Sequence, residues 1–436
     1  MPNILYNQIA MKQKFGKMRI LKYKPGDKVK RYDFKRKPLR PYLLMWLIHL
    51  IVWFKVLFRR HKVYRYGNKP KRPCLILASH AAFNDFYMLF SAVKTYNINY
   101  VTAIDAFYDM STFLMRIIGA ICKRKFISDM SLMKNLKYCT EKLKSVTVIY
   151  PEARYSLDGT TSYLPESNGK LAKFLKVPVY VFKLRGSYVS DPQWNKYKQN
   201  RMPMEGDMIE VVSAEEVGKL SAEEINERIN KAFKYDDWQY LKDCGNILTY
   251  KERATNLNAI LYQCPHCKKE FEMVGKGTTL TCTACGKIWD MLENGELKAR
   301  DGETYFSHIP DWFAWQKQNV HEEVFSGKYS VEEECEVFTL PDSKGFYHQG
   351  KGKFIQTSNG TTLKINLYGE DKTIEYSGTS LESVHIEYNY KGYGDMLDFS
   401  IYGDSVWMHP YRKDFITKVS LATEEIRELH NKNIKK

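Results

Sequence analysis

The chain has 436 residues, more than one hydrophobic core usually serves, so two to four domains are expected. A hydrophobic content of 44% and an aromatic content of 14% argue against a disordered chain. The first 72 residues carry 21 Lys and Arg against two Asp, a net charge of +19, whereas the rest of the chain sums to −2. The basic excess therefore belongs to the N-terminal segment, whose partner is expected to be a polyanionic surface.

An apolar run at 42–58 lies inside this basic segment and contains only two residues that ionise near neutral pH, His49 and Lys55. As a helix it would be about 25 Å long, slightly short of the roughly 30 Å of a hydrocarbon core. Trp46 and Trp53 suit the boundary between membrane and water. We expect this helix to lie in the membrane plane or to insert shallowly. A full span and a buried core helix are the alternatives.

From residue 73 onward, short apolar runs typical of buried strands alternate with helical segments. Strands are predicted at 74–78, 100–104, 145–150 and 177–182, and helices at 85–94, 113–121, 131–143 and 169–175. This alternation predicts an α/β domain with helices packed on a sheet. Polar sequences follow the strands, where α/β folds tend to place their sites.

The first predicted strand is followed by His80, and Asp85 lies five positions later in the first turn of a helix with Asn84 as its cap. Histidine titrates near neutrality, and a carboxylate that accepts from one ring nitrogen raises the basicity of the other. The pair is therefore a candidate general base. The alternative is a capping turn in which Asp85 only complements the helix dipole.

A second polar sequence follows the strand at 145–150, where Glu152 and Arg154 come directly after Pro151. Arginine offers a planar fork of donors to phosphate oxygens, and the glutamate can orient that arginine or accept from a hydroxyl. The two residues therefore suit recognition of a phosphate or glycerol headgroup.

Two further elements complete the pattern, a basic turn from Gly119 to Arg124 and the sequence Val-Pro-Val at 177–179. In order and spacing, the four elements closely resemble the motifs of the glycerolipid acyltransferase family, whose best-known members acylate lysophosphatidic acid. The resemblance covers under a third of the chain. One departure is Ala153, which stands where the family has glycine, with arginine directly after it. Variants with adjacent Gly-Arg resemble acyltransferases that act on lysophosphatidylethanolamine, so the acceptor stays open.

The resemblance implies that His80 and Asp85 are catalytic and that Arg124, Glu152 and Arg154 bind substrate. His80, oriented by Asp85, would take the proton from an acceptor hydroxyl as its oxygen attacks an acyl thioester. The expected donor is acyl-CoA or acyl carrier protein. The expected acceptor is a lysophospholipid such as 1-acylglycerol-3-phosphate, at the cytoplasmic face of a membrane.

Four of the nine cysteines form two Cys-x-x-Cys pairs, Cys264 with Cys267 and Cys282 with Cys285, separated by 14 residues. Pairs at this spacing place four thiolates tetrahedrally around zinc. Four thiolates leave no open coordination position, so we predict a structural zinc ribbon rather than a catalytic metal. The pattern favours metal binding in a reducing compartment over a disulfide framework.

Beyond the ribbon, alternating apolar residues at 362–368 and 384–388 predict antiparallel strands. The predicted fold is therefore an α/β acyltransferase domain with a mixed sheet, combined with three other parts. The predicted boundaries are a membrane-associating segment at 1–72, the acyltransferase domain at 73–245, the zinc ribbon at 246–300 and a mainly-β domain of unknown role at 301–436.

An alternative function keeps the acyltransferase-like scaffold without catalysis, and makes the zinc ribbon and basic arm a nucleic-acid- or protein-binding module. The cysteine module contains only Lys268, Lys269 and Lys276 as basic residues, balanced in part by Glu270 and Glu272. We therefore expect no nucleic acid partner.

Overall fold

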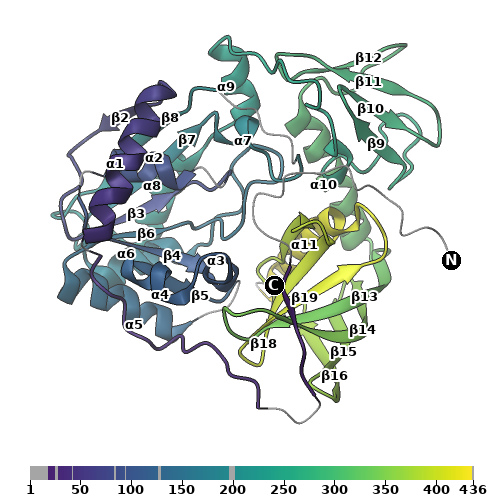
Figure 1. Ribbon diagram of the computed structural model, residues 1–436. Helices are drawn as coiled ribbons and strands as arrows, with labels where there is room; N and C mark the ends of the chain where they lie inside the picture. The colour runs from purple at the N-terminus through teal and green to yellow at the C-terminus, as the bar shows by residue number, and fades with distance from the viewer. Residues whose placement is uncertain are drawn as a thin grey trace.

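In the part of the chain that it describes, the computed structural model (Figure 1) contains three sheets, one in each of the α/β domain, the ribbon and the C-terminal domain. Asn84, the predicted helix cap, lies outside the described residues. The structure describes residues 18–24, 28–41, 43–82, 85–93, 95–125, 129–195 and 202–434.

The α/β domain is built on a seven-stranded sheet in the order β2-β8-β7-β3-β6-β4-β5. The pairs are parallel except for β7 with β8, which confirms the predicted mixed sheet. The strands are β2 (Lys62–Tyr66), β3 (Cys74–Ala78), β4 (Ile98–Ala103), β5 (Ala120–Lys123), β6 (Val146–Ile149), β7 (Val179–Arg185) and β8 (Glu205–Val212).

Helices cover both faces of this sheet, because alternate residues of its strands point to opposite sides. In β3, Ile76 packs into one core, and Leu75 and Leu77 pack into the other. The first core is covered by α1 (Leu43–Phe58), α2 (Asp85–Ala92), α3 (Ile104–Asp109) and α4 (Thr112–Ile117). The second is covered by α5 (Met130–Tyr138), α6 (Ser167–Leu175) and α8 (Ala222–Phe233).

The helix predicted at 113–121 is wrong in its second half. Helix α4 ends at Ile117, and the following residues form β5, an edge strand of the sheet. Between them Gly119 has a φ of +92°, and a Cβ there would lie 2.3 Å from the carbonyl oxygen of Ile98. The apolar run looked continuous in the sequence because it is too short for the two periodicities to be told apart.

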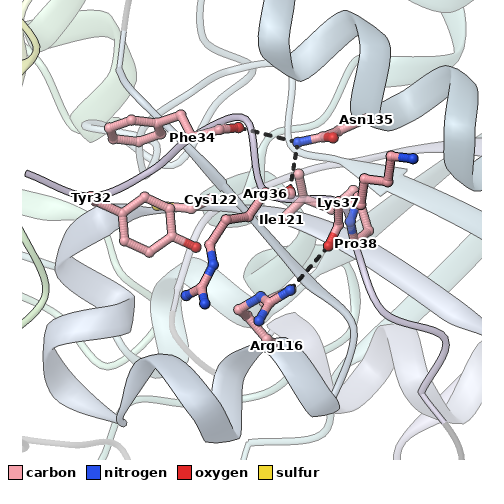
Figure 2. Close-up of a pocket in the computed structure, with 10 residues that line it drawn as sticks. Tyr32, Phe34, Arg36, Lys37, Pro38, Arg116, Ile121, Cys122 and Asn135 are labelled. Carbon is pink, nitrogen blue, oxygen red and sulfur yellow. Dashed lines mark hydrogen bonds between the residues drawn. The ribbon is translucent and has the colours of Figure 1, made fainter.

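The N-terminal segment at 28–41 runs along the outer edge of β5 and is held there by side chains of the α/β domain. The Asn99 amide donates to the carbonyl oxygen of Leu39 at 2.9 Å, and Arg116 donates to that of Lys37 at 3.1 Å. A small pocket between this segment and β5 is lined by basic side chains of the segment and by Arg116 of α4, and Asn135 donates to the segment (Figure 2). The segment thus covers a strand edge that would otherwise be exposed. Part of the basic excess therefore packs against the protein itself.

Helix α1 presents a strongly apolar face to solvent. Met45 and Val52 pack into the core, whereas Trp46, Trp53 and Phe58 are 56%, 56% and 81% exposed. Within the described part of the chain, no helix combines the length and apolar character needed to cross a membrane.

The C-terminal region confirms the predicted mainly-β architecture. Its sheet has the order β16-β15-β14-β13-β19-β18-β17, and a short N-terminal strand, β1 (Ile20–Leu21), pairs with β14. The strands are β13 (Ser330–Leu340), β14 (Phe346–Thr357), β15 (Gly360–Leu367), β16 (Glu370–Ser377), β17 (His385–Tyr390), β18 (Gly394–Ile401) and β19 (Asp404–Pro410). Two helices pack on each other beside this sheet, α10 (Ile309–Phe325) and α11 (Phe415–Ile434).

The ribbon sheet has the order β12-β11-β10-β9 and is antiparallel throughout. One hydrophobic core joins it to both neighbours, since Trp238 of the α/β domain, Trp289 of the ribbon and Trp312 of α10 belong to the same cluster. The rings of Trp289 and Trp312 lie 5.0 Å apart. The strands are β9 (Met273–Lys276), β10 (Thr279–Cys282), β11 (Ile288–Met291) and β12 (Leu297–Ala299).

Candidate functional site

His80 and Asp85 are brought together at the end of β3, where the chain turns into α2. The Asp85 Oδ2 atom is 3.2 Å from Nδ1 of His80, and it accepts from the backbone N–H groups of Ala81 and Ala82 at 2.7 and 3.0 Å. The other carboxylate oxygen accepts from the hydroxyl of Ser187. Asp85 is buried and fully hydrogen-bonded, so it holds one ring nitrogen of His80 in a fixed place.

The other ring nitrogen of His80, Nε2, has no hydrogen-bond partner among the described residues. The side chain is 24% exposed, so a reacting group can approach it. The ring also packs against Tyr150 and Tyr155, with centroid distances of 4.3 and 4.2 Å. Burial raises the pKa of Tyr155 well above its usual value, and the nearby carboxylates of Glu387, Asp85 and Asp105 add to the effect. The arrangement therefore presents an oriented imidazole with one nitrogen that forms no hydrogen bond to any described residue.

Glu152 holds the turn that carries His80. Its Oε2 accepts from the backbone N–H of His80 at 2.8 Å, and its Oε1 accepts from the N–H of Ser162 and the hydroxyl of Tyr235 at 2.9 and 3.1 Å. The side chain is buried, and it is not paired with Arg154. The structure thus shows Glu152 positioning His80, and its contact with a substrate stays a prediction.

Arg154 points into the C-terminal domain. Its Nη1 donates to the hydroxyls of Ser383 and Ser420 at 2.9 and 2.7 Å, and its Nη2 lies 2.6 Å from a carboxylate oxygen of Glu424. The side chain is only 7% exposed. In this arrangement the guanidinium joins the two domains, and its predicted role in substrate binding stays a prediction.

Arg124 lies just after β5 and contacts residues other than those of the His80 turn. Its Nη2 is 3.6 Å from Asp129, and its guanidinium lies 5.1 Å from the ring centroid of Phe34 in the N-terminal segment. Its side chain remains 27% exposed. Among the described residues no hydrogen bond or ion pair joins it to His80, so its role in substrate binding is likewise still a prediction.

Ser187 is the residue of this site that the sequence did not reveal. It lies in the turn after β7, at the start of the short helix α7 (Ser187–Ser190), 102 positions from the carboxylate that it contacts. The strand predicted at 177–182 ends before Arg185, the last residue of β7, so the only signal in the sequence was the place of Ser187 beside Gly186.

The raised pKa of Glu152 gives a testable pH dependence. Burial raises the pKa of Glu152 to about 7 from an ordinary value of 4.5, so the folded state keeps a proton that the unfolded state has already lost in this range. Folding stability therefore falls as the pH rises through that range. Between about pH 5 and about pH 7.5, we expect the free energy of unfolding of wild type to fall by about 2 kcal/mol more than that of Glu152→Gln. Urea unfolding of both proteins at both pH values measures this difference.

Other buried carboxylates whose pKa is raised, such as Asp237, are present in both proteins, so their effect cancels. A stability difference that stays constant with pH would mean that Glu152 is already ionised at pH 5 in the folded state.

The four cysteines of the ribbon are brought together as the spacing predicts. The sulfur atoms of Cys264 and Cys285 are 3.8 Å apart, and those of Cys267 and Cys282 are 3.7 Å apart. All four lie within 4.8 Å of one another and could hold a metal ion. These separations suit a tetrahedral thiolate shell with metal–sulfur bonds of about 2.3 Å.

The two cysteine turns have the same backbone form. In each, an amide four residues after the first cysteine donates to its carbonyl, from Lys268 to Cys264 and from Gly286 to Cys282. Both donors have a positive φ, +64° and +78°. The turns are thus preformed to present two thiolates each, and the donor set fits zinc.

Comparisons with known proteins do not identify a family for this chain. No family model matches the chain, and a search among curated proteins finds no match. Among solved structures, the 1-acyl-sn-glycerophosphate (LPA) acyltransferase PlsC from Thermotoga maritima is similar to part of the chain, with 18% sequence identity and a TM-score of 0.35. The match covers 43% of this chain and 76% of that one. A likeness of this size carries no argument, so the function proposed below rests on the site and on the sequence motifs.

Proposed function

We propose that this protein is an acyltransferase that moves a fatty acyl group from a thioester to a hydroxyl, with His80 as the general base. The observation that supports it best is the His80–Asp85 pair, in which Nδ1 is held by a buried carboxylate and Nε2 is open. A base oriented in this way accepts the hydroxyl proton as the oxygen attacks the thioester carbonyl. The thiolate is then expelled and takes this proton from the His80 imidazolium, so the base is restored, the product thiol leaves and no covalent enzyme intermediate is needed.

The proposed donor is acyl-CoA or acyl carrier protein, and the proposed acceptor is a lysophospholipid such as 1-acylglycerol-3-phosphate. Support comes from the resemblance of the motifs around His80, Arg124 and Arg154 to those of glycerolipid acyltransferases. Of the two arginines, Arg124 is the more exposed, at 27% against 7%, and is therefore the better placed to meet an anionic headgroup without rearrangement.

The direct test is to incubate the purified protein with acyl-CoA or acyl carrier protein and a panel of lysolipids, and to identify products by mass spectrometry. We expect one acylated product that depends on His80. Absence of any acylated lipid with both donors would favour the alternative function, a non-catalytic scaffold that carries a binding module.

We also propose that α1 binds the cytoplasmic face of a membrane, which would bring the site close to its lipid substrates. Its exposed aromatic residues suit the interface, and Arg59 and Arg60 follow them directly. Replacing Trp46, Trp53 and Phe58 with serine is expected to weaken binding to anionic vesicles by at least about tenfold, because three apolar side chains no longer enter the lipid. Vesicle co-sedimentation measures this binding.

High salt should weaken the binding of wild type only in part, since the apolar contribution is insensitive to salt. Tyr402→Ser is a matched control, because this aromatic residue is 70% exposed on the C-terminal domain. Full-length protein that stays unbound at low salt would exclude the membrane proposal. Deleting 1–60 is a poor test, because part of that segment packs against both large domains.

A further inference from the structure

A second group of ligand-type side chains lies where the C-terminal sheet meets the α/β domain. Asp105 belongs to the first turn of α3, and His385 and Glu387 lie two residues apart on β17. One ligand atom from each of the three lies within 4.8 Å of the others. A histidine and two carboxylates from separate domains thus converge at one point of the interface.

The neighbours of this group account for only some of its polar atoms. The His385 Nε2 atom is 3.0 Å from Oε1 of Glu387, and the Gln193 amide donates to Oε2 of the same carboxylate at 2.8 Å. The ammonium group of Lys125 lies 3.1 Å from Oδ2 of Asp105 and 3.3 Å from Asp398. Lys125 therefore pairs with one carboxylate oxygen of Asp105, Oδ2, and does not pair with the other, Oδ1.

Two buried atoms of the group have no hydrogen-bond partner in the described part of the chain, Oδ1 of Asp105 and Nδ1 of His385. His385 is only 4% exposed, so its ring is shielded from bulk water. Buried polar atoms are nearly always paired, because an unpaired one has lost its hydration without replacement. An ion-pair network around Lys125 alone leaves Oδ1 of Asp105 unexplained.

We propose that Asp105, His385 and Glu387 bind a divalent metal ion that joins the C-terminal domain to the α/β domain. One imidazole and two carboxylates form a donor set of nitrogen and oxygen, which suits Mn²⁺ or Zn²⁺. Lys125 can stay on Oδ2 of Asp105, because the other oxygen, Oδ1, has no hydrogen-bond partner among the described residues and is available as a ligand. The site differs in kind from the four thiolates of the ribbon, and it needs no acyltransferase activity to exist.

The difference in donors allows the two sites to be measured separately. Thiolates select Zn²⁺, whereas carboxylates favour Mn²⁺. Full-length protein is therefore first loaded with zinc at the ribbon and then titrated with Mn²⁺, and the free aquo ion is followed by electron paramagnetic resonance. We expect one Mn²⁺ to bind per chain. His385→Ala and Glu387→Gln should each weaken this binding by at least about tenfold, because each removes one of three ligands.

Glu387→Gln keeps the size of the side chain, so it still tests Mn²⁺ binding at the proposed site if His385→Ala does not fold. The matched control is His321→Ala, which removes the histidine of a more exposed group formed with Glu425 and Glu428. Unchanged Mn²⁺ binding in this control is expected. No Mn²⁺ binding by wild type, binding that is lost in His321→Ala, or equal binding by wild type and both interface variants would overturn the proposal.

Discussion

Replacing His80 with alanine is expected to lower acyl transfer by about 10²–10⁴-fold, because the reaction then lacks its general base. The fold should survive, since the contacts that hold the turn use the backbone of His80: its N–H donates to Glu152 and its carbonyl accepts from Ser156. Both are kept in the variant. Product formation measured by mass spectrometry, with thermal unfolding of the same preparations, tests the two expectations together.

Asp85→Asn should fall between wild type and His80→Ala. An asparagine oxygen can still accept from the turn amides, but the charge that supports a protonated imidazole is gone. His266→Ala is the control, because this histidine is exposed in the first cysteine turn of the ribbon, where its ring nitrogen contacts Tyr305. Wild-type turnover in His80→Ala would exclude the proposed mechanism.

The parts of the site that the sequence revealed are those set by local spacing. His80 and Asp85 are five residues apart across the end of one strand, and each cysteine pair is set by a single turn. A buried strand such as β3 can also be predicted from the sequence, because all five of its residues are buried and apolar. These features depend on short stretches of chain, so a single sequence contains enough information to predict them.

The remaining features depend on contacts between distant segments, which no spacing rule predicts. Glu152 reaches the N–H of His80 across 72 positions, and Arg154 reaches Ser420 across 266. A glutamate and an arginine close together in sequence were expected to act on one substrate group, but the fold directs one to the turn that carries His80 and the other to the C-terminal domain. The packing of the N-terminal segment beside β5 could not be predicted for the same reason, because it depends on contacts between distant residues such as Leu39 and Asn99.

Replacing Cys282 with serine is expected to lower the zinc content from one ion per chain and to unfold the ribbon locally. Cys264 and Cys282 are fully buried, so the variant loses a strong ligand at the centre of a small sheet. In sites this small, metal binding supplies much of the folding free energy, with apparent values of about 10–16 kcal/mol in zinc-finger peptides. The damage should spread to α10, because Trp289 packs against Trp312. Metal analysis and limited proteolysis near 260–290 measure both effects.

Acyl transfer per folded molecule should be largely retained in this variant, because neither of the two hydrophobic cores that pack on the sheet carrying His80 contains a residue of the ribbon. A closed four-thiolate shell also has no position for a substrate. The matched control is Cys244→Ser, an exposed cysteine upstream of the ribbon whose spacing gives it no metal partner. Chelation that stops turnover quickly and reversibly, while the ribbon stays resistant to protease, would contradict a structural zinc. The catalytic metal would then have to lie at the His80 turn, with its free ring nitrogen as a ligand rather than a base.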